Sequence, residues 1–198
     1  MTEPGWDAAY APGASAPWDI GRPQPAFARL ADSGLLSGRV LDAGCGTGEH
    51  ALLAAACGAE AVGADVSPRA IARAREKAAA RGLAVRFEVA DALDFGELGM
   101  TFGTVIDSGL FHVFDDEGRA RYVTSLASVL EAAGTCYLMC FSDRQPGDFG
   151  PRRVRQDELT AAFGHGWIVT DIAADTFELN PWPGTTTAQA WLATIRRL

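Results

Sequence analysis

The stretch RVLDAGCGTGEH, residues 39–50, decides the fold of this chain. Val40 and Leu41 are apolar and indicate the end of a buried strand, and glycines then recur at positions 44, 46 and 48. Residues 51–56 are alanines and leucines, which favour a helix. A strand, a glycine-rich turn and a helix in this order predict a nucleotide site in an α/β sheet, because glycine lets the backbone approach a ligand closely and the helix start offers free N–H groups.

The spacing of this motif separates two kinds of ligand. A dinucleotide fingerprint reads G-x-G-x-x-G, whereas this chain has D-x-G-x-G-x-G, with Asp42 two residues before the first glycine. A carboxylate at that point would repel a pyrophosphate and attract a cation. The motif therefore favours a cationic ligand, and a glycine-rich turn without any ligand is the less favoured alternative.

Composition and charge describe a globular protein with small-molecule partners. The 198 residues suit a single domain, 48% of them are hydrophobic, and the net charge is −8. An acidic chain of this kind is a poor partner for nucleic acid or for an anionic membrane surface. We expect a cytoplasmic protein, monomeric or homodimeric, with a flexible arm over residues 1–17, rich in Pro, Gly and Ala, and one domain over residues 18–198.

The cysteines and histidines do not predict a metal site. Cys45, Cys57, Cys136 and Cys140 form no C-x-x-C pair, and the three histidines are far apart in the sequence. Metal ligands usually recur at short, regular spacings. We therefore expect no bound metal.

Three further acids follow predicted strands. Asp65 ends a short strand 23 residues after Asp42, about the separation at which an acid binds ribose hydroxyls in Rossmann-type sites. Asp91 follows a strand at residues 84–90, with Asp94 as a competing candidate, and Asp107 ends a strand that begins at residue 102. Ligands of such sheets bind beyond the carboxyl ends of the strands, where the strand order reverses, so these acids are expected around one site.

The remaining pattern completes an α/β chain. Helices are predicted over residues 24–36, 68–80, 116–133 and 156–163, with Ser67 as the cap of the second and Gly134 at the end of the third. Residues 135–141 are a continuous apolar run, typical of a strand buried on both faces. Strands within residues 166–179 and 186–195 have no helix between them and therefore predict an antiparallel pair.

Three segments resemble one family. The D-x-G-x-G-x-G run resembles motif I of the class I S-adenosylmethionine (SAM) methyltransferases. The run DSGLFHVF at residues 107–114, followed by RARYV at residues 119–123, resembles motif IV of their small-molecule members, which include thiopurine, thiol/halide, tellurite-resistance and heterocyclic-toxin methyltransferases. The segment W-D-x-G-x-P at residues 18–23 resembles the segment that precedes motif I in these enzymes. The resemblance covers about residues 18–197.

The resemblance implies a fold and a cofactor. The fold is a Rossmann-like, seven-stranded, mostly parallel sheet of order 3-2-1-4-5-7-6, with a C-terminal antiparallel hairpin and helices on both faces. The cofactor is SAM, which becomes S-adenosylhomocysteine (SAH). The residues expected to hold it are Trp18, Asp42, Gly44, Gly46, Gly48, Asp65, Val66, Asp91, Ala92 and Asp107. For Trp18, a lid over the cofactor and a loop residue tucked into the core both remain open.

The methyl acceptor is expected beside the segment at residues 107–114. Candidate substrate residues are Phe111, His112, Phe114, Phe149, Arg152, Arg153 and Trp182. His112 is the first candidate for a catalytic base and Asp107 the second, with a structural histidine as the alternative. The loop at residues 142–155 holds four of the 17 basic residues, which fits either a solvated loop or a cap that brings an arginine to an anionic substrate.

The sequence thus predicts a SAM-dependent methyltransferase acting on a heteroatom, oxygen before sulfur, of a small aromatic or heterocyclic compound in detoxification or secondary metabolism. Three rivals stay open at this point. They are a thiol, halide or metalloid methyltransferase, a Rossmann dehydrogenase disfavoured by the glycine spacing, and a non-catalytic SAM-binding module.

Overall fold

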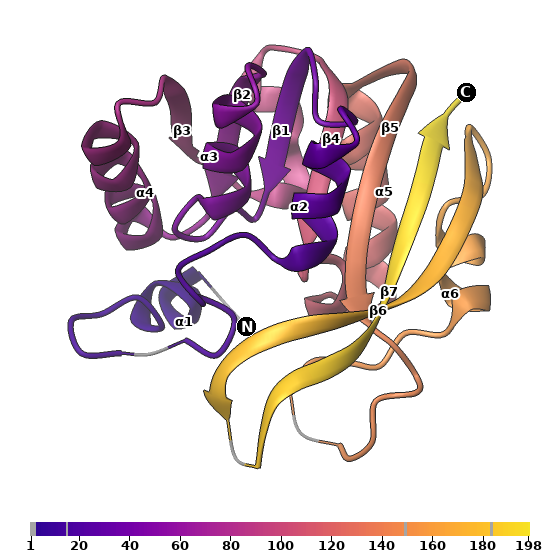
Figure 1. Cartoon of the computed structure of the whole chain (residues 1–198). Coiled ribbons are helices and arrows are strands. Elements are labelled where there is room, and N and C mark those ends of the chain that lie inside the picture. Colours follow the sequence, from indigo (N-terminus) through magenta and orange to yellow (C-terminus); the bar gives the residue numbers. More distant parts are fainter. Residues whose placement is uncertain (1–2, 15, 149, 183) are drawn as a thin grey trace.

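The computed structural model describes residues 3–14, 16–148, 150–182 and 184–198, with the side chains of all of these except residues 3, 4 and 182. Seven strands form one sheet of order β3-β2-β1-β4-β5-β7-β6, which confirms the predicted fold class (Figure 1). The strands are β1 (Arg39–Ala43), β2 (Glu60–Asp65), β3 (Val85–Val89), β4 (Phe102–Ser108), β5 (Leu130–Phe141), β6 (Trp167–Trp182) and β7 (Thr185–Arg197). The first five run parallel, and β7 is antiparallel to both β5 and β6.

Helices cover both faces of this sheet. The α-helices are α1 (Glu3–Ala8), α2 (Pro25–Asp32), α3 (Glu49–Ala56), α4 (Pro68–Arg81), α5 (Asp116–Val129) and α6 (Gln156–Ala162), and two 3₁₀ turns are η1 (Ala92–Leu98) and η2 (Phe111–Val113). Val40 packs into a core cluster with Phe27 of α2, whereas the next residue, Leu41, packs into the cluster that contains Leu126 of α5. The alternation of side chains along a strand thus places α2 and α5 on opposite faces.

The strand order brings the glycine motif and the β4 exit together. β1 pairs with β2 on one side and β4 on the other, so that Ala43 lies between Ala64 and Asp107. The chain leaves β1 and β4 at the same edge, in opposite directions along the sheet. This is the edge at which open α/β sheets bind their ligands.

Two helices end earlier than the sequence predicts. α5 stops at Val129 rather than at residue 133, because Leu130 joins β5 opposite Phe102. The pairing then shifts, so that Thr104 lies opposite Thr135, and Ala133 takes a positive φ of 63° within the irregularity. α2 stops at Asp32, where Gly34 with φ 71° turns the chain. Leu36 and Leu130 are buried although they lie beyond the two helix ends. They extend the apolar pattern of the sequence past each helix, and the pattern alone therefore predicts helices that are too long.

The N-terminal segment is folded in its described part, although its composition predicts a flexible arm. α1 lies against the start of α4, where Asp7 Oδ1 accepts hydrogen bonds from Ser67 Oγ (2.8 Å) and from the backbone N–H of Arg69 (3.0 Å). Arg69 also forms an ion pair with Asp7 at 3.2 Å. These contacts join residues about 60 positions apart, so local composition gave no sign of them.

The β6–β7 hairpin is longer than expected and extends beyond the rest of the sheet (Figure 1). Its far part lies at the same edge as α1 and the exits of β1 and β4. None of the helices in the described part of the chain is long and apolar enough to cross a membrane.

Candidate active site

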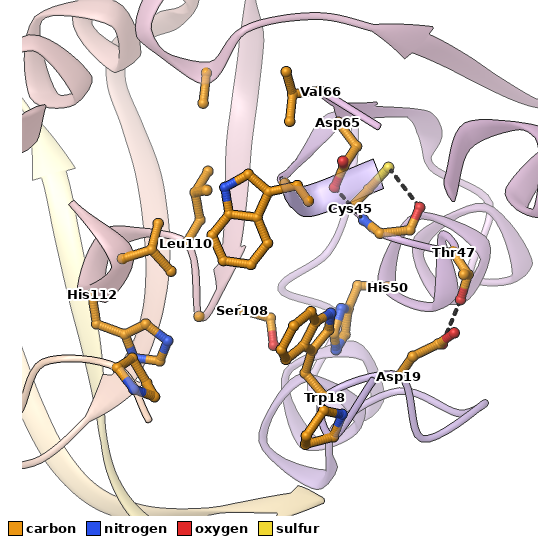
Figure 2. A pocket seen from close by; sticks show the side chains of 18 of the residues that line it. Trp18, Asp19, Cys45, Thr47, His50, Asp65, Val66, Ser108, Leu110 and His112 are labelled. Atoms are coloured by element: carbon orange, nitrogen blue, oxygen red, sulfur yellow. Dashed lines mark hydrogen bonds between the residues drawn. The ribbon is translucent and has the colours of Figure 1, made fainter. Parts of the chain in front are cut away.

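A cavity of about 1090 Å³ opens at the carboxyl edge of the sheet. One end is formed by the glycine loop and the exits of β2 and β3, and the other by the β4 exit, Phe141 and the β6 hairpin. Figure 2 shows Asp65 and Cys45 on one side, His112 on the other, and Trp18, His50 and Ser108 between them. We name the two ends of the cavity the cofactor end and the acceptor end, after the ligands that the sequence motifs predict there.

Side chains on the glycine loop would be crowded and their backbone strained. Gly44 and Gly46 line the cavity with φ values of 65° and 52°. A Cβ on Gly44 would lie 3.1 Å from Leu110, and one on Gly46 would lie 2.8 Å from the Tyr10 hydroxyl. Gly48 does not line the cavity. Its missing Cβ instead allows the Phe87 ring to approach within 2.7 Å of that position, so its role is helix–sheet packing.

Asp42 lies behind the loop as a buried acid with an unpaired oxygen. Its Oδ2 accepts a hydrogen bond from the Ala51 N–H at 2.9 Å, while Oδ1 has no partner among the described residues. Burial, together with the charges of Asp65 and Asp107, raises its pKa to about 7. A buried carboxyl of this kind is stabilised in its charged form by a nearby cation. Asp42 does not reach the cavity surface, so the structure suits a charge effect rather than direct contact.

Asp65 and Asp91, which the sequence predicts to bind the ribose and the adenine, both line the cavity at the exits of β2 and β3. Asp65 lines the cavity and accepts N–H bonds from Gly46 and Ser67, both at 2.8 Å, and burial raises its pKa. Asp91 caps η1 through the Leu93 N–H at 2.9 Å. Val66, Asp91 and Ala92 also line this end, whereas Asp94 does not. The structure thus brings the predicted ribose and adenine residues into one cavity.

Aromatic residues from the N-terminal segment cover the cofactor end. Trp18 lines the cavity and donates its Nε1–H to the Tyr10 hydroxyl at 2.9 Å, and Trp6 packs edge-on against Trp18 at 5.7 Å. Asp19 accepts a hydrogen bond from the Thr47 hydroxyl at 2.6 Å, which ties this segment to the glycine loop (Figure 2). The geometry fits the lid that the sequence left open for Trp18, and Tyr10, which no sequence motif marks, also contributes to it.

His112 is buried at the acceptor end between two aromatic rings. The rings of Phe141 and Phe177 lie 5.1 and 6.1 Å from it, and only 6% of its surface is exposed. Its Nδ1 accepts the Phe141 N–H at 2.9 Å. Burial, and then the charges of Arg119 and Arg153, lower its pKa to about 3.

This geometry makes His112 a donor rather than the base expected from the sequence. A neutral imidazole whose Nδ1 accepts a hydrogen bond carries its proton on Nε2. Nε2 then has no free lone pair with which to take a proton from a substrate. The neighbouring residue Gly109, with φ 90°, places no side chain over the Nε2 atom. A Cβ there would lie 3.3 Å from Nε2.

Asp107 does not reach the cavity, contrary to its predicted catalytic and cofactor roles. Its oxygens accept N–H bonds from Leu110 (2.7 Å) and Phe111 (3.1 Å) and the hydroxyl proton of Tyr122 (3.0 Å). The carboxyl is fully buried, which raises its pKa to about 7. Asp107 therefore shapes the turn that presents residues 108–114 to the cavity.

The other predicted acceptor residues divide into two groups. Phe114 and Arg152 line the cavity, although Arg152 is also ion-paired with Asp116 and Glu158. Phe111 is fully buried against Phe163, with ring centroids 5.9 Å apart, and so lies behind the site.

Arg153 also fails to reach the cavity. It donates to the carbonyl oxygens of Pro151 (2.6 Å) and Gly147 (3.1 Å) and thereby orders its own loop. Phe149 lies outside the described residues, as does the side chain of Trp182.

The cavity also contains residues that the sequence did not single out. His50 accepts the Gln24 N–H on Nε2 at 3.1 Å, and burial lowers its pKa to about 4, so its Nδ1 carries a proton. Phe141, Phe177 and Leu179 add apolar walls from β5 and β6. Phe141, Phe177 and Leu179 are far from the motifs in sequence, and of these three only Phe141 stands at a strand end that could have pointed to the site, whereas His50 ends the glycine-motif stretch itself. Across the described residues, no group of three or more His, Cys, Asp or Glu is placed to hold a metal ion.

Comparisons with known proteins agree with this geometry. Residues 40–134 match the family model described as "Methyltransferase domain". A curated relative, 2-heptyl-1-hydroxyquinolin-4(1H)-one methyltransferase of Mycobacteroides abscessus, is 42% identical over 161 residues, which is 79% of this chain and 70% of that protein. A solved structure from work on "Conversion of a Disulfide Bond into a Thioacetal Group during Echinomycin Biosynthesis" is 38% identical, with a TM-score of 0.89, and the match covers 100% of this chain and 92% of that one.

A more distant structure shares the fold. It is Burkholderia thailandensis 1,6-didemethyltoxoflavin-N1-methyltransferase with bound 1,6-didemethyltoxoflavin and SAH, at 18% identity and a TM-score of 0.72, covering 98% of this chain and 86% of that one. These matches speak against a dehydrogenase, and the glycine cradle and the unpaired buried acid of this structure fit a cationic cofactor. The chain therefore belongs to the class I SAM-dependent methyltransferases that act on small molecules.

Proposed function

We propose that this methyltransferase transfers its methyl group to an oxygen of a small aromatic or heterocyclic hydroxy compound, which binds as an oxyanion. The observation that carries the proposal is the hydrogen bond from the Phe141 N–H to His112 Nδ1, from which the imidazole proton is inferred to lie on Nε2. A hydrogen-bond donor in an apolar site favours an acceptor oxygen that is already negative.

SAM supplies a methyl carbon on a positively charged sulfur, which a well-placed nucleophile can attack. Asp42 would balance that charge, Gly44 and Gly46 would let the backbone approach the methionine part, and Trp18 would cover it. Asp65 with Val66 would hold the ribose, and Asp91 with Ala92 the adenine. The chain's own task is to align the two partners and to exclude water.

The acceptor end suits a flat, acidic molecule. Phe114, Phe141 and Phe177 offer ring faces, and His112 offers one donor among them. Among the described lining residues of this end, Asp115 is the one carboxylate, and its Oδ1 already accepts the Gly118 N–H at 2.8 Å as the cap of α5. Because His112 acts as a donor and Asp115 is the exposed cap of α5, we infer that the acceptor hydroxyl loses its proton to solvent before the reaction.

The relatives support the choice of oxygen and leave sulfur as a second candidate. The 42%-identical relative is named for a compound with an N-hydroxyl group. The 38%-identical structure is connected with the conversion of a disulfide bond into a thioacetal group, which is sulfur chemistry and favours transfer to sulfur instead. In either case we place the reaction in detoxification or secondary metabolism in the cytoplasm, with no nucleic-acid or membrane partner, in a monomer or homodimer.

The test is transfer of a labelled methyl group from SAM to a panel of hydroxylated quinolines, phenols, aromatic thiols and halide. We expect labelled O-methyl products from acidic hydroxyheteroaromatics. The His112→Ala variant should lose most of that activity, while His165→Ala, a change at an exposed histidine, should retain it. Transfer to thiols alone would establish the second candidate, and full activity of His112→Ala would exclude the assigned role of His112.

A further inference from the structure

Arg119 is a buried cation with unused hydrogen-bond donors. It lies in the first turn of α5 and is only 4% exposed. Its Nε and Nη2 have no partner in the described part of the chain, and its Nη1 lies 3.6 Å from a Glu158 oxygen. A buried guanidinium with unpaired N–H groups lowers stability, so a protein that keeps one has a reason other than stability.

The charge of Arg119 is only partly balanced. Glu158 of α6 is shared, because it also pairs with Arg152 and accepts the Arg155 N–H at 2.8 Å. Asp116, the other acid nearby, has a side chain that is 84% exposed and is therefore screened by water. Arg152 repels Arg119, and the pKa of Arg119 is lowered, first by its own burial and then by Arg152. The Cys140 thiol of β5 is the remaining titratable group that acts on it.

Arg119 lies directly behind the acceptor end. Its guanidinium carbon is 4.6 Å from the centre of the Phe111 ring, and the next residue, His112, lines the cavity. The charged groups that act on His112 are Arg119 from α5 and Arg153 from the loop, which lies 5.5 Å from the Phe141 ring. Arg153 is only half-buried and donates to four carbonyl oxygens, whereas the Arg119 charge is buried.

We propose that Arg119 is a positioning residue of the acceptor site. Its buried positive charge, held behind the Phe111 ring, opposes a second positive charge on His112 and favours an acceptor that binds as an anion. This inference rests on the proposed function and deepens it, because it assigns the anion preference to one residue that touches neither substrate nor cofactor. It also explains why the chain retains an arginine with unpaired donors in its core.

The test compares Arg119→Met and Arg119→Gln, which remove the charge, with Arg119→Lys, which keeps it. Arg121→Met is the matched control, since Arg121 is an exposed residue of the same helix. The first measurement is an NMR titration of the His112 ring in the SAH complex, with the signal assigned by its loss in His112→Gln. We expect the His112 pKa to rise by roughly one unit or more in the Met and Gln variants and to stay low in the Lys and control proteins.

The second measurement uses 1-hydroxyquinolin-4(1H)-one as the acidic acceptor. In Arg119→Met its KM should rise about tenfold or more, with SAH affinity unchanged, and Arg119→Lys should restore most of the effect. The thermal midpoint of Arg119→Met should equal or exceed that of the wild type, because a buried and only partly balanced charge with two unpaired donor atoms has been removed. If Arg119→Met does not fold, Arg119→Gln gives the same comparisons.

An unchanged His112 pKa in the folded Met or Gln variant overturns the proposal. An unchanged KM together with a lowered thermal midpoint also overturns it, because that result would show that Arg119 has a purely structural role. The NMR titration needs no acceptor. If the wild-type protein methylates no hydroxyheteroaromatic, the proposed function fails, and the titration alone still decides whether Arg119 controls His112.

Discussion

Asp42 is a side chain that suits a bound cation and lowers the stability of the protein without ligand. Its Oδ1 is buried without a partner among the described residues, and its pKa is raised to about 7 mainly by burial. A bound cation would favour the charged carboxylate and so lower that pKa again. By linkage, the cation and the loss of the proton must strengthen each other.

We therefore predict that Asp42→Asn weakens SAM binding by roughly tenfold or more, because the charge is lost while the acceptor for the Ala51 N–H is kept. Calorimetry should show a larger loss for SAM than for SAH, which lacks the positive sulfur. Wild-type affinity for SAM should also rise between pH 6 and pH 8, and that dependence should vanish in the variant. Asp32→Asn, at an exposed position on α2, is the control. Equal losses for SAM and SAH would mean that Asp42 acts on shape alone.

The hydrogen bond from the Phe141 N–H to His112 leads to a second prediction at this scale. Glutamine can accept that N–H and still offer a donor, whereas alanine can do neither. We expect kcat/KM to fall by about 10- to 100-fold in His112→Ala and by clearly less in His112→Gln.

The pH profile distinguishes a donor from a base in the same variants. For two acceptors whose hydroxyl pKa values differ, the rise of kcat/KM with pH should follow each acceptor, both in the wild type and in His112→Gln. A midpoint common to both acceptors that disappears in His112→Gln would instead identify His112 as a base.

At the scale of elements, strand β6 connects the cover of the cofactor end with the wall of the acceptor end. Asn180 donates from its side chain to the carbonyl oxygens of Ala16 (2.9 Å) and Asp19 (2.8 Å), and its N–H donates to Pro17 (2.8 Å). Gln24 is bonded through its amide to both backbone groups of Glu178. The segment around Trp18 is thus attached to the same strand that supplies Phe177 and Leu179 to the acceptor end.

We predict that Asn180→Ala loosens this segment and speeds the release of SAH, since two of its three anchors to β6 at this point are lost. Stopped-flow measurement should show a several-fold faster dissociation rate, and hydrogen exchange should increase over residues 16–24. Asp171→Ala, at an exposed position on the same strand, is the control. An unchanged rate with unchanged exchange would show that the attachment does not govern release.

Over the whole molecule, four buried groups give opposing contributions to the pH dependence of stability. Asp42 and Asp107 have a pKa raised to about 7 from 3.8, so they stabilise the fold at low pH, and this contribution is lost as pH rises through about 7. His50 and His112 have pKa values lowered to about 4 and about 3 from 6.5, so their contribution is present above 6.5 and is lost as pH falls. Between about pH 4.5 and 6 the two pairs offset each other.

Burial also raises the pKa of Asp65, so the reference for this prediction is the profile of the wild-type protein without ligand. Removing one carboxyl whose pKa is raised, with Asp107→Asn, should shift the change in the free energy of unfolding between about pH 4.5 and 6 upward relative to the wild type, by on the order of 1–2 kcal/mol. Urea unfolding of both proteins at several pH values measures this difference. Asp115→Asn, at an exposed acid, should keep the wild-type profile. A wild-type profile in Asp107→Asn would show that Asp107 is not held protonated.

Local patterns determined the parallel α/β core and its cofactor motif. The alternate glycines, the acids at strand ends and the cap at Ser67 act within a few residues of themselves, so the sequence was sufficient to predict the glycine turn, α4 and the adjoining strands. The strand order came from resemblance, because periodicity alone does not say which strands pair. The lengths of α2 and α5 were overestimated, since apolar periods at Leu36 and Leu130 continue past the helix ends.

Only the tertiary structure decided what the acceptor residues do. His112 lines the cavity and the adjacent Phe111 does not. The reason is the turn after β4, which is fixed by the hydrogen bonds of Asp107 with the Phe111 N–H and the Tyr122 hydroxyl. The tautomer of His112 depends on an N–H 29 residues away, and the fold of the N-terminal segment depends on Ser67 and Asn180 at still longer range. Burial and long-range hydrogen bonds set the protonation state of these side chains and the direction in which they point. Neither burial nor a long-range hydrogen bond is a property of a local stretch of sequence.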